Sequence, residues 1–178
     1  MRKIINKILF ILVLVLATFA CVACGNKEPE KSNLEIALES KMDAPASYKV
    51  VSIIKVSDKE IYKETSDYVK ADDKYNYSST IKKLNALSEE NEYSEENKEG
   101  SITTPYSCEL KSEYFSDATV SEGLLKANLT ETGANALVGE GAKDAKIEVS
   151  FGSGKVNSLS LSYKMNDQDV SYKVEFTY

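Results

Sequence analysis

The sequence contains no histidine and no tryptophan, and it has only three cysteines and three prolines. Without histidine, the chain lacks the commonest general base and the commonest transition-metal ligand. This excludes a Ser-His-Asp triad, a Cys-His pair and a histidine-ligated zinc site. The run Gly152-Ser153-Gly154-Lys155 lacks the spacing of a phosphate loop and lies where a hairpin turn is expected. We therefore expect neither a metal ion nor a cofactor.

Catalysis by carboxylates alone is the remaining enzymatic alternative. A glycoside hydrolase needs two carboxyl groups about 5 to 9.5 Å apart. The chain has 28 acidic residues, but no spacing in the sequence singles out a pair. The sequence therefore favours a protein that binds over one that catalyses.

The N-terminus begins with three positive charges, Arg2, Lys3 and Lys7, and continues with thirteen uncharged residues from Ile8 to Ala20. A basic start, a short apolar run and small residues at its end are the layout of a secretory signal peptide. The alternative is an uncleaved membrane helix, but the strongly apolar part ends near Leu16, which is short for the roughly 30 Å hydrocarbon core. Both interpretations place the rest of the chain outside the cytoplasm.

Two cysteines lie at the end of this apolar run, in the stretch ATFACVACGNKEPEKS (17–32). A redox C-x-x-C motif would need a βαβ context, which this position does not offer. The stretch resembles the lipobox of bacterial lipoproteins of the Gram-positive type, with Val22-Ala23 before Cys24, although residue 21 is not the usual leucine. The resemblance implies acylation of Cys24, for example by palmitate, and removal of Cys21 with a signal peptide of residues 1–23. Several acyl chains would anchor the protein stably to the outer face of the cell membrane, and residues 24–32 would form a polar tether.

The length and charge of the remaining chain limit its domain count and its partners. A mature chain from Cys24 has 155 residues, which is enough for one domain, expected at 33–178. Losing the three basic residues of the signal peptide leaves 19 basic against 28 acidic residues, a net charge of about −9. This acidic balance argues against nucleic acid as a partner.

Hydrophobic periodicity predicts one helix followed by about eight strands. Ser32-Asn33-Leu34-Glu35 has the form of a capping box and begins a helix expected at 33–42. The short turns between consecutive strands require antiparallel pairing, and the first strand is apolar on both sides, as in a central strand covered on both faces. The segment 132–143 is expected to be a helical turn or a loop. Strands are expected at 47–57, 60–70, 74–82, 105–115, 122–130, 145–151, 155–165 and 169–178.

Two features within this pattern have competing interpretations. The acidic stretch 88–101 could bind calcium, but it lacks the ordered ligand spacing of an EF-hand and is interpreted as a solvated loop. Cys108 is in phase with Tyr106, Leu110 and Tyr114, which favours a small buried hydrophobe over a reactive thiol.

The predicted fold is mainly β (α+β), an N-terminal helix and an antiparallel curved sheet or half-barrel, with a two-layer β-sandwich as the alternative. This order of elements resembles the half-barrel of the lipoprotein carriers of the outer membrane and of related small Gram-positive lipoproteins. The resemblance implies an apolar sheet face that holds the acyl chains of a lipid or other amphiphile, although the same residues could simply fill a core. The candidate ligand-facing residues are Val50, Ile54, Leu159, Leu161, Tyr163, Val174 and Phe176.

A second functional hypothesis is an interaction or structural module of the cell envelope that binds an envelope protein. Tyrosine is favoured at interfaces because it joins contact area to a hydrogen bond. The tyrosines that would supply such a surface are Tyr62, Tyr68, Tyr75 and Tyr77.

Overall fold

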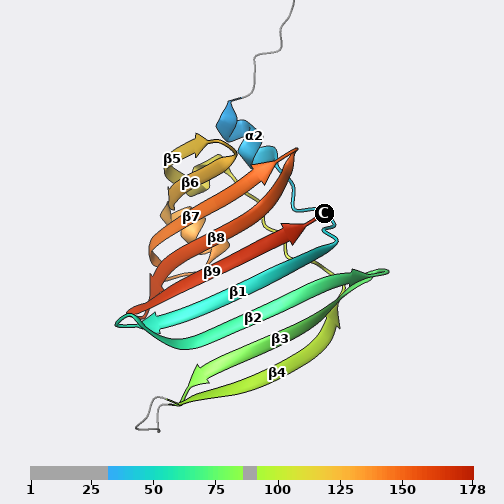
Figure 1. The fold of residues 1–178 in the computed structure, drawn as a ribbon. Coiled ribbons are helices and arrows are strands. Elements are labelled where there is room, and N and C mark those ends of the chain that lie inside the picture. Colours follow the sequence, from blue (N-terminus) through green and yellow to red (C-terminus); the bar gives the residue numbers. More distant parts are fainter. Residues whose placement is uncertain (1–31, 86–91) are drawn as a thin grey trace, which may run out of the picture. The chain divides into compact units, whose positions relative to one another are not determined.

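The computed structural model describes residues 32–85 and 92–178, so the expected signal peptide, Cys24 and most of the tether lie outside the described residues. The described residues form one curved, unclosed antiparallel sheet with two short α-helices and one 3-10 turn (Figure 1). The helices are α2 (Asn33–Glu39) and α3 (Glu131–Leu137), and the 3-10 turn is η1 (Ser112–Tyr114). The strands are β1 (Ser47–Val56), β2 (Lys59–Ala71), β3 (Lys74–Leu84), β4 (Tyr93–Ile102), β5 (Phe115–Ser121), β6 (Leu124–Leu129), β7 (Lys143–Gly152), β8 (Lys155–Met165) and β9 (Gln168–Thr177). The expected mainly β class is confirmed, and the sheet is single rather than a sandwich.

The strands have the spatial order β4-β3-β2-β1-β9-β8-β7-β6-β5. Each half of this order is a meander of consecutive hairpins, and the two meanders meet where β1 pairs with β9. In that pairing Tyr48 lies opposite Phe176, and Val50 lies opposite Val174. The prediction that residues 47–57 form a central strand is therefore confirmed.

Period-two alternation separates the sheet into two faces. On β9, Val174 and Phe176 point to the same face as Leu159 of β8, and all three are buried. This face carries the hydrophobic core, and we call it the covered face. The opposite face carries Ser, Lys and Glu at the intervening positions, and we call it the open face. Figure 1 looks onto the open face, with α3 behind the strands.

The chain passes from the edge strand β4 to the opposite edge strand β5 through residues 103–111, which we call the strap. The prediction of a strand at 105–115 is wrong. The strap crosses the covered face, and residues 103–111 pair with no neighbouring strand. Its alternation has another cause: Leu110 is buried, and Tyr106 and Cys108 pack partly buried against the core. An extended segment lying across a sheet has one buried side, just as a strand has.

Cys108 belongs to this strap. Its Sγ lies 3.9 Å from the Sδ of Met42, in the segment between α2 and β1. Burial raises the pKa of the Cys108 thiol, so it stays protonated near neutral pH. This environment fits the interpretation of Cys108 as a packing residue.

The acidic stretch 88–101 also differs from its predicted structure. Residues 93–102 form β4, a strand at the edge of the sheet in which all residues except Ile102 are exposed. Lys82 and Lys83 of β3 pair with Glu95 and Glu96 at 3.3 and 3.7 Å. Because this edge strand has no buried face, its sequence does not alternate between apolar and polar residues. Its polar, charged composition therefore resembles that of a loop. Residues 86–91 of this stretch lie outside the described part of the chain.

Both helices begin with a side-chain cap. The capping box of α2 is present as predicted, since the Ser32 hydroxyl accepts from the Glu35 backbone N–H and the Glu35 carboxylate accepts from the Ser32 N–H. The helix ends at Glu39, three residues earlier than expected, because Ser40 turns extended and Lys41 forms a bridge with Lys155. The segment 132–143, expected as a helical turn or loop, contains all of α3 except its first residue, Glu131. Both helices pack at the β5–β6 end of the sheet.

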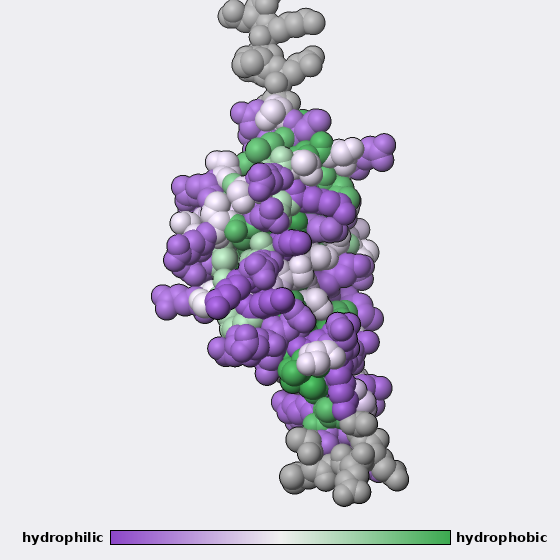
Figure 2. Space-filling view, turned by 90° about the vertical axis from the view of Figure 1, so that its left-hand side faces the viewer, coloured by the Kyte–Doolittle hydropathy of each residue, from purple (hydrophilic) through white to green (hydrophobic). Residues whose placement is uncertain are grey.

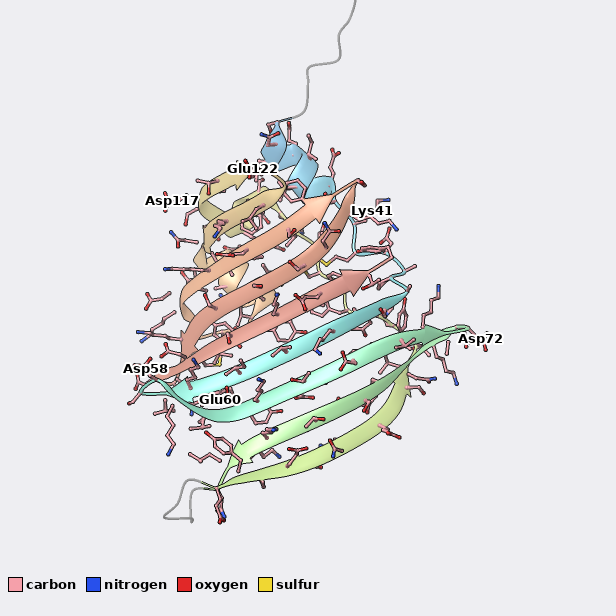
Figure 3. The ribbon with its side chains drawn as sticks, viewed as in Figure 1. Lys41, Asp58, Glu60, Asp72, Asp117 and Glu122 are labelled. Atoms are coloured by element: carbon pink, nitrogen blue, oxygen red, sulfur yellow. The ribbon has the colours of Figure 1, made fainter. Side chains whose placement is uncertain are left out.

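The hairpin turns use residues in the left-handed region. The pairs Glu122-Gly123 and Ser153-Gly154 have positive φ at both positions, as do Ser57-Asp58 and Asn166-Asp167. Two such residues form the type I′ turn, whose twist matches that of the flanking strands. Figure 3 places Asp58 at one end of the sheet and Asp72, in the β2–β3 turn, at the other.

The structure predicts different costs for alanine at two otherwise matched turn glycines. Gly123 and Gly154 have φ values of +74° and +73°, but a Cβ on Gly123 would lie 2.6 Å from the Phe151 carbonyl oxygen, while Gly154 faces open space. We expect Gly154→Ala to lower the free energy of unfolding by about 1 kcal/mol through backbone strain alone. Gly123→Ala should cost about 1 to 3 kcal/mol more. Urea denaturation of both variants measures the difference, and equal losses would contradict this account of the turn.

Candidate functional site

A groove runs along β8 on the open face. Ser160 and Ser162 are short side chains, whereas the neighbouring strands carry Lys146 and Glu148 on β7 and Lys173 and Glu175 on β9. Ser160 and Ser162 therefore lie lower than the Lys and Glu side chains beside them, and Ser171 of β9 continues this low surface next to Ser162. The resulting groove has a volume of about 470 Å³, within the range of about 300–1,000 Å³ that ligand pockets occupy.

Three of the four charged side chains in the walls of the groove form ion pairs. Glu175 pairs with Lys173 on the same strand, and Glu148 pairs at 2.9 Å with Lys126 of β6. Fixed in this way, the long side chains present their methylene stems to the groove. Most of the surface that the groove offers is consequently apolar despite its charged rim.

The apolar floor continues onto the central strand. Val51 and Ile53 of β1 point to the open face and line the groove. Both are half-buried, although the sequence indicated that this strand is covered on both faces. That interpretation is wrong for the described residues, in which long neighbouring side chains shield Val51 and Ile53 without a second layer. These two residues were missed as site candidates because their β-branched side chains also suit any central strand.

At one end the groove opens into a larger hollow of about 840 Å³, and the two share Lys146, Ser162 and Ser171. We call it the charged hollow. It lies where β1, β7, β8 and β9 begin or end, near the turn that holds Asp58 (Figure 3). Its charged lining residues are Lys55, Asp58, Asp144, Lys146, Lys164 and Asp169. Figure 2 shows this side of the molecule covered mostly by hydrophilic residues, with small hydrophobic patches between them.

Strand register places the side chains of all seven residues expected to face a ligand on the covered face, although Leu161 also borders the groove and Tyr163 the charged hollow. Four of them are core residues with little exposure: Leu159, Leu161, Val174 and Phe176. The other three, Val50, Ile54 and Tyr163, are half-buried. The structure thus uses more than half of this set for packing, and it provides a groove on the face that the sequence indicated to be polar.

The four tyrosines of the alternative hypothesis also point to the covered face. Tyr75 is buried and donates its hydroxyl to the Pro45 carbonyl at 2.8 Å, so it is a core residue. Tyr68 stacks on Tyr48 with ring centroids 4.3 Å apart and also contacts Tyr77 at 5.5 Å. Tyr62, Tyr68 and Tyr77 are half-buried rather than fully exposed.

Burial shifts the acidity of these rings. Loss of hydration raises the pKa of Tyr48 to about 12, partly offset by a backbone hydrogen bond from Tyr106. The pKa of Tyr62 also rises to about 12, through burial and through its hydrogen bond of 2.6 Å to the Glu64 carboxylate. Burial likewise raises the pKa values of Tyr106 and Tyr172. All four hydroxyls are neutral at physiological pH, so each retains a proton that it can donate in a hydrogen bond.

The three carboxylates that line the charged hollow, Asp58, Asp144 and Asp169, are exposed. Among residues 32–85 and 92–178, no Asp or Glu is buried, and only Glu60 and Glu64 are half-buried. Glu64 accepts from Tyr62 and, at 3.3 Å, from Ser66. Within the same ranges, no three His, Cys, Asp or Glu side chains gather closely enough to hold a metal ion. None of the described helices has both the length and the apolar character to cross a membrane.

Comparisons with known proteins assign no family. No family model and no curated protein matches the chain. Among solved structures, the kievitone hydratase of Nectria haematococca aligns with a TM-score of 0.28 and 14% identity. The alignment covers 86% of this chain and 54% of the hydratase chain, so this chain spans about half of that protein's length. A similarity of this level supports no conclusion about fold or activity.

The raised tyrosine pKa values predict a loss of stability at alkaline pH. In the unfolded chain Tyr48 ionises near its ordinary pKa of 10.0, whereas in the folded protein it stays protonated until about pH 12. The unfolded state therefore releases its proton first, and stability falls as the pH rises from 10 to 12. We expect Tyr48→Phe to make this fall shallower, as measured by urea denaturation at pH 8, 10 and 11.5. An unchanged slope would contradict the assigned burial of the Tyr48 hydroxyl.

Proposed function

We propose that this chain is a membrane-anchored, extracytoplasmic, non-enzymatic lipoprotein that binds a hydrophobic or amphiphilic ligand. The observation that carries the proposal is the groove on the open face, with Val51 and Ile53 in its floor. These two side chains are half-buried on a face that otherwise carries mostly Ser, Lys and Glu. Burying these two side chains under a ligand would remove apolar area from water, which is the main driving force for binding.

The shape of the groove favours a narrow ligand over a flat protein surface. Its floor crosses Ser160 and Ser162 of β8, Ser171 of β9, and Val51 and Ile53 of β1, and the longer Lys and Glu side chains of β7 and β9 border it. An acyl chain or a similar extended apolar group fits between such walls. The rim of paired Lys and Glu would contact the polar part of an amphiphile or solvent.

The described residues that line the groove all belong to one compact unit. The sheet, the core and the helices α2 and α3 all lie within the compact unit Ser32–Tyr178. A unit with its own hydrophobic core has what independent folding requires. Residues 32–178 are thus a suitable protein for binding experiments.

Substitution in the groove floor tests the proposal. We expect residues 32–178 to bind a fluorescent fatty acid, and Val51→Lys to weaken binding at least about tenfold, since it places a charge in the apolar floor. Val69→Lys is the matched control, because Val69 is on the same face but outside the groove, with 57% exposure. It should leave affinity within about twofold. Titration of fluorescence measures both variants.

Native mass spectrometry of the domain purified from a membrane-rich bacterial host provides a second readout. A co-purified lipid that is lost in Val51→Lys would support the proposal. Absence of both co-purified lipid and fatty-acid binding would overturn it, as would equal losses in Val51→Lys and Val69→Lys.

The anchor is tested by the mass of the mature chain. We expect the full chain, expressed in a bacterial host that processes lipoproteins, to begin at Cys24 and to carry acyl groups. Cys24→Ala should abolish the acyl mass, whereas Cys21→Ala should leave the mature mass unchanged because residue 21 is removed. Intact mass spectrometry distinguishes these outcomes, and an unmodified Cys24 would contradict the proposed anchor.

A further inference from the structure

Six charged side chains line the charged hollow, and their charges balance. Three are lysines and three are aspartates: Lys55, Lys146, Lys164, Asp58, Asp144 and Asp169. They come from the ends of β1, β7, β8 and β9 and from the β1–β2 turn. The hollow therefore has neither a net positive nor a net negative charge, although both kinds of charge are present.

These six side chains form no ion pairs within the described part of the chain, where no opposite charge lies within 4.0 Å of any of them. The absence of an ion pair is unexpected for Asp169, because the strand register places it directly opposite both Lys55 and Lys164. Elsewhere on the same face, register partners do form ion pairs, as Lys49 and Asp67 do at 3.4 Å.

Unpaired charges of both signs around one hollow favour a ligand that carries both signs. A simple anion would meet the aspartates as well as the lysines, and a simple cation would meet the lysines as well as the aspartates. Either ion would be attracted by the side chains of opposite charge and repelled by those of like charge. A ligand with an anionic and a cationic group can contact both sets at once, since ammonium groups accept no hydrogen bonds and carboxylates donate none.

The hollow is also continuous with the apolar groove. Lys146, Ser162 and Ser171 line both of them, so a group in the hollow would lie beside the floor formed by Val51 and Ile53. Apolar surface next to a hollow of mixed charge corresponds to the two parts of an amphiphile with a zwitterionic headgroup.

We propose that the charged hollow binds the zwitterionic headgroup of a phospholipid-class amphiphile, with the lysines on the phosphate and the aspartates on the ammonium group. This inference rests on the proposed function, because the groove must hold the apolar chain. It adds a selectivity that the groove alone does not provide: ligands with equal chains are distinguished by their headgroups.

Three probes with the same acyl chain, used below their micelle concentrations, test this selectivity with residues 32–178. They are lysophosphatidylethanolamine, which is zwitterionic, lysophosphatidylglycerol, which is anionic, and an uncharged monoacylglycerol. Isothermal titration calorimetry should give at least about tenfold tighter binding of the zwitterionic probe than of either other probe.

Two substitutions locate the selectivity. We expect Lys164→Gln and Asp169→Asn each to weaken binding of the zwitterionic probe about fivefold or more, without changing the affinity for monoacylglycerol. The matched controls are Lys49→Gln and Asp67→Asn, which alter an ion pair on the same face outside the groove and the hollow. They should change none of the three affinities. All of these positions are exposed, so circular dichroism should show folded variants throughout.

The outcomes separate this inference from the proposed function. Equal affinity for all three probes, or an unchanged preference in Lys164→Gln and Asp169→Asn, would overturn the headgroup site, while loss of all binding in Val51→Lys would still support the groove. Tighter binding of the anionic probe would also overturn it, in favour of the lysines acting alone. Failure of every probe to bind would overturn the groove and the headgroup site together.

Discussion

The pairing of β1 with β9 is the interaction on which the rest of the fold depends. Each meander is local, because its strands pair with their neighbours in the chain, whereas β1 and β9 come from opposite ends of the domain. Their ladder turns two separate sheets into one. It also unites the core, since Tyr48 from the first meander and Phe176 from the second pack together with ring centroids 6.2 Å apart. The groove depends on the same pairing, because its floor combines Val51 and Ile53 with serines of β8 and β9.

The hairpins could be predicted from the sequence because their determinants are local. Alternation and turn residues placed 155–165 and 169–178 within a residue of β8 and β9. The prediction of a strand at 105–115 was wrong because the strap has the same alternation as a strand. Only the positions of β4 and β5 at opposite edges of the sheet show that the strap must cross it. β4 was missed because an exposed edge strand has no buried face, and so no alternation marks it.

The groove could not be predicted because it depends on which strands are neighbours. Ser160 and Ser162 appear in the sequence only as the polar side of a strand, and a groove exists because Lys146 and Glu148 of β7 and Lys173 of β9 lie beside them. The expected ligand-facing residues share one apolar face, but that face is largely occupied by the strap and the core. Long-range pairing thus determines which of two plausible faces has room for a ligand.

The two edges of the sheet differ in a way that affects association between molecules. An open edge presents unpaired backbone N–H and C=O groups that can pair with a strand of another copy. β4 has ten residues with an exposed edge, but it carries Glu95, Glu96, Lys98 and Glu99, and desolvating these charges would oppose such pairing. β5 has only seven residues and is interrupted by a bulge at Asp117, where φ is positive. The open sheet cannot protect its edges by closing into a barrel. The charges of β4 and the bulge in β5 therefore limit aggregation through these two edge strands.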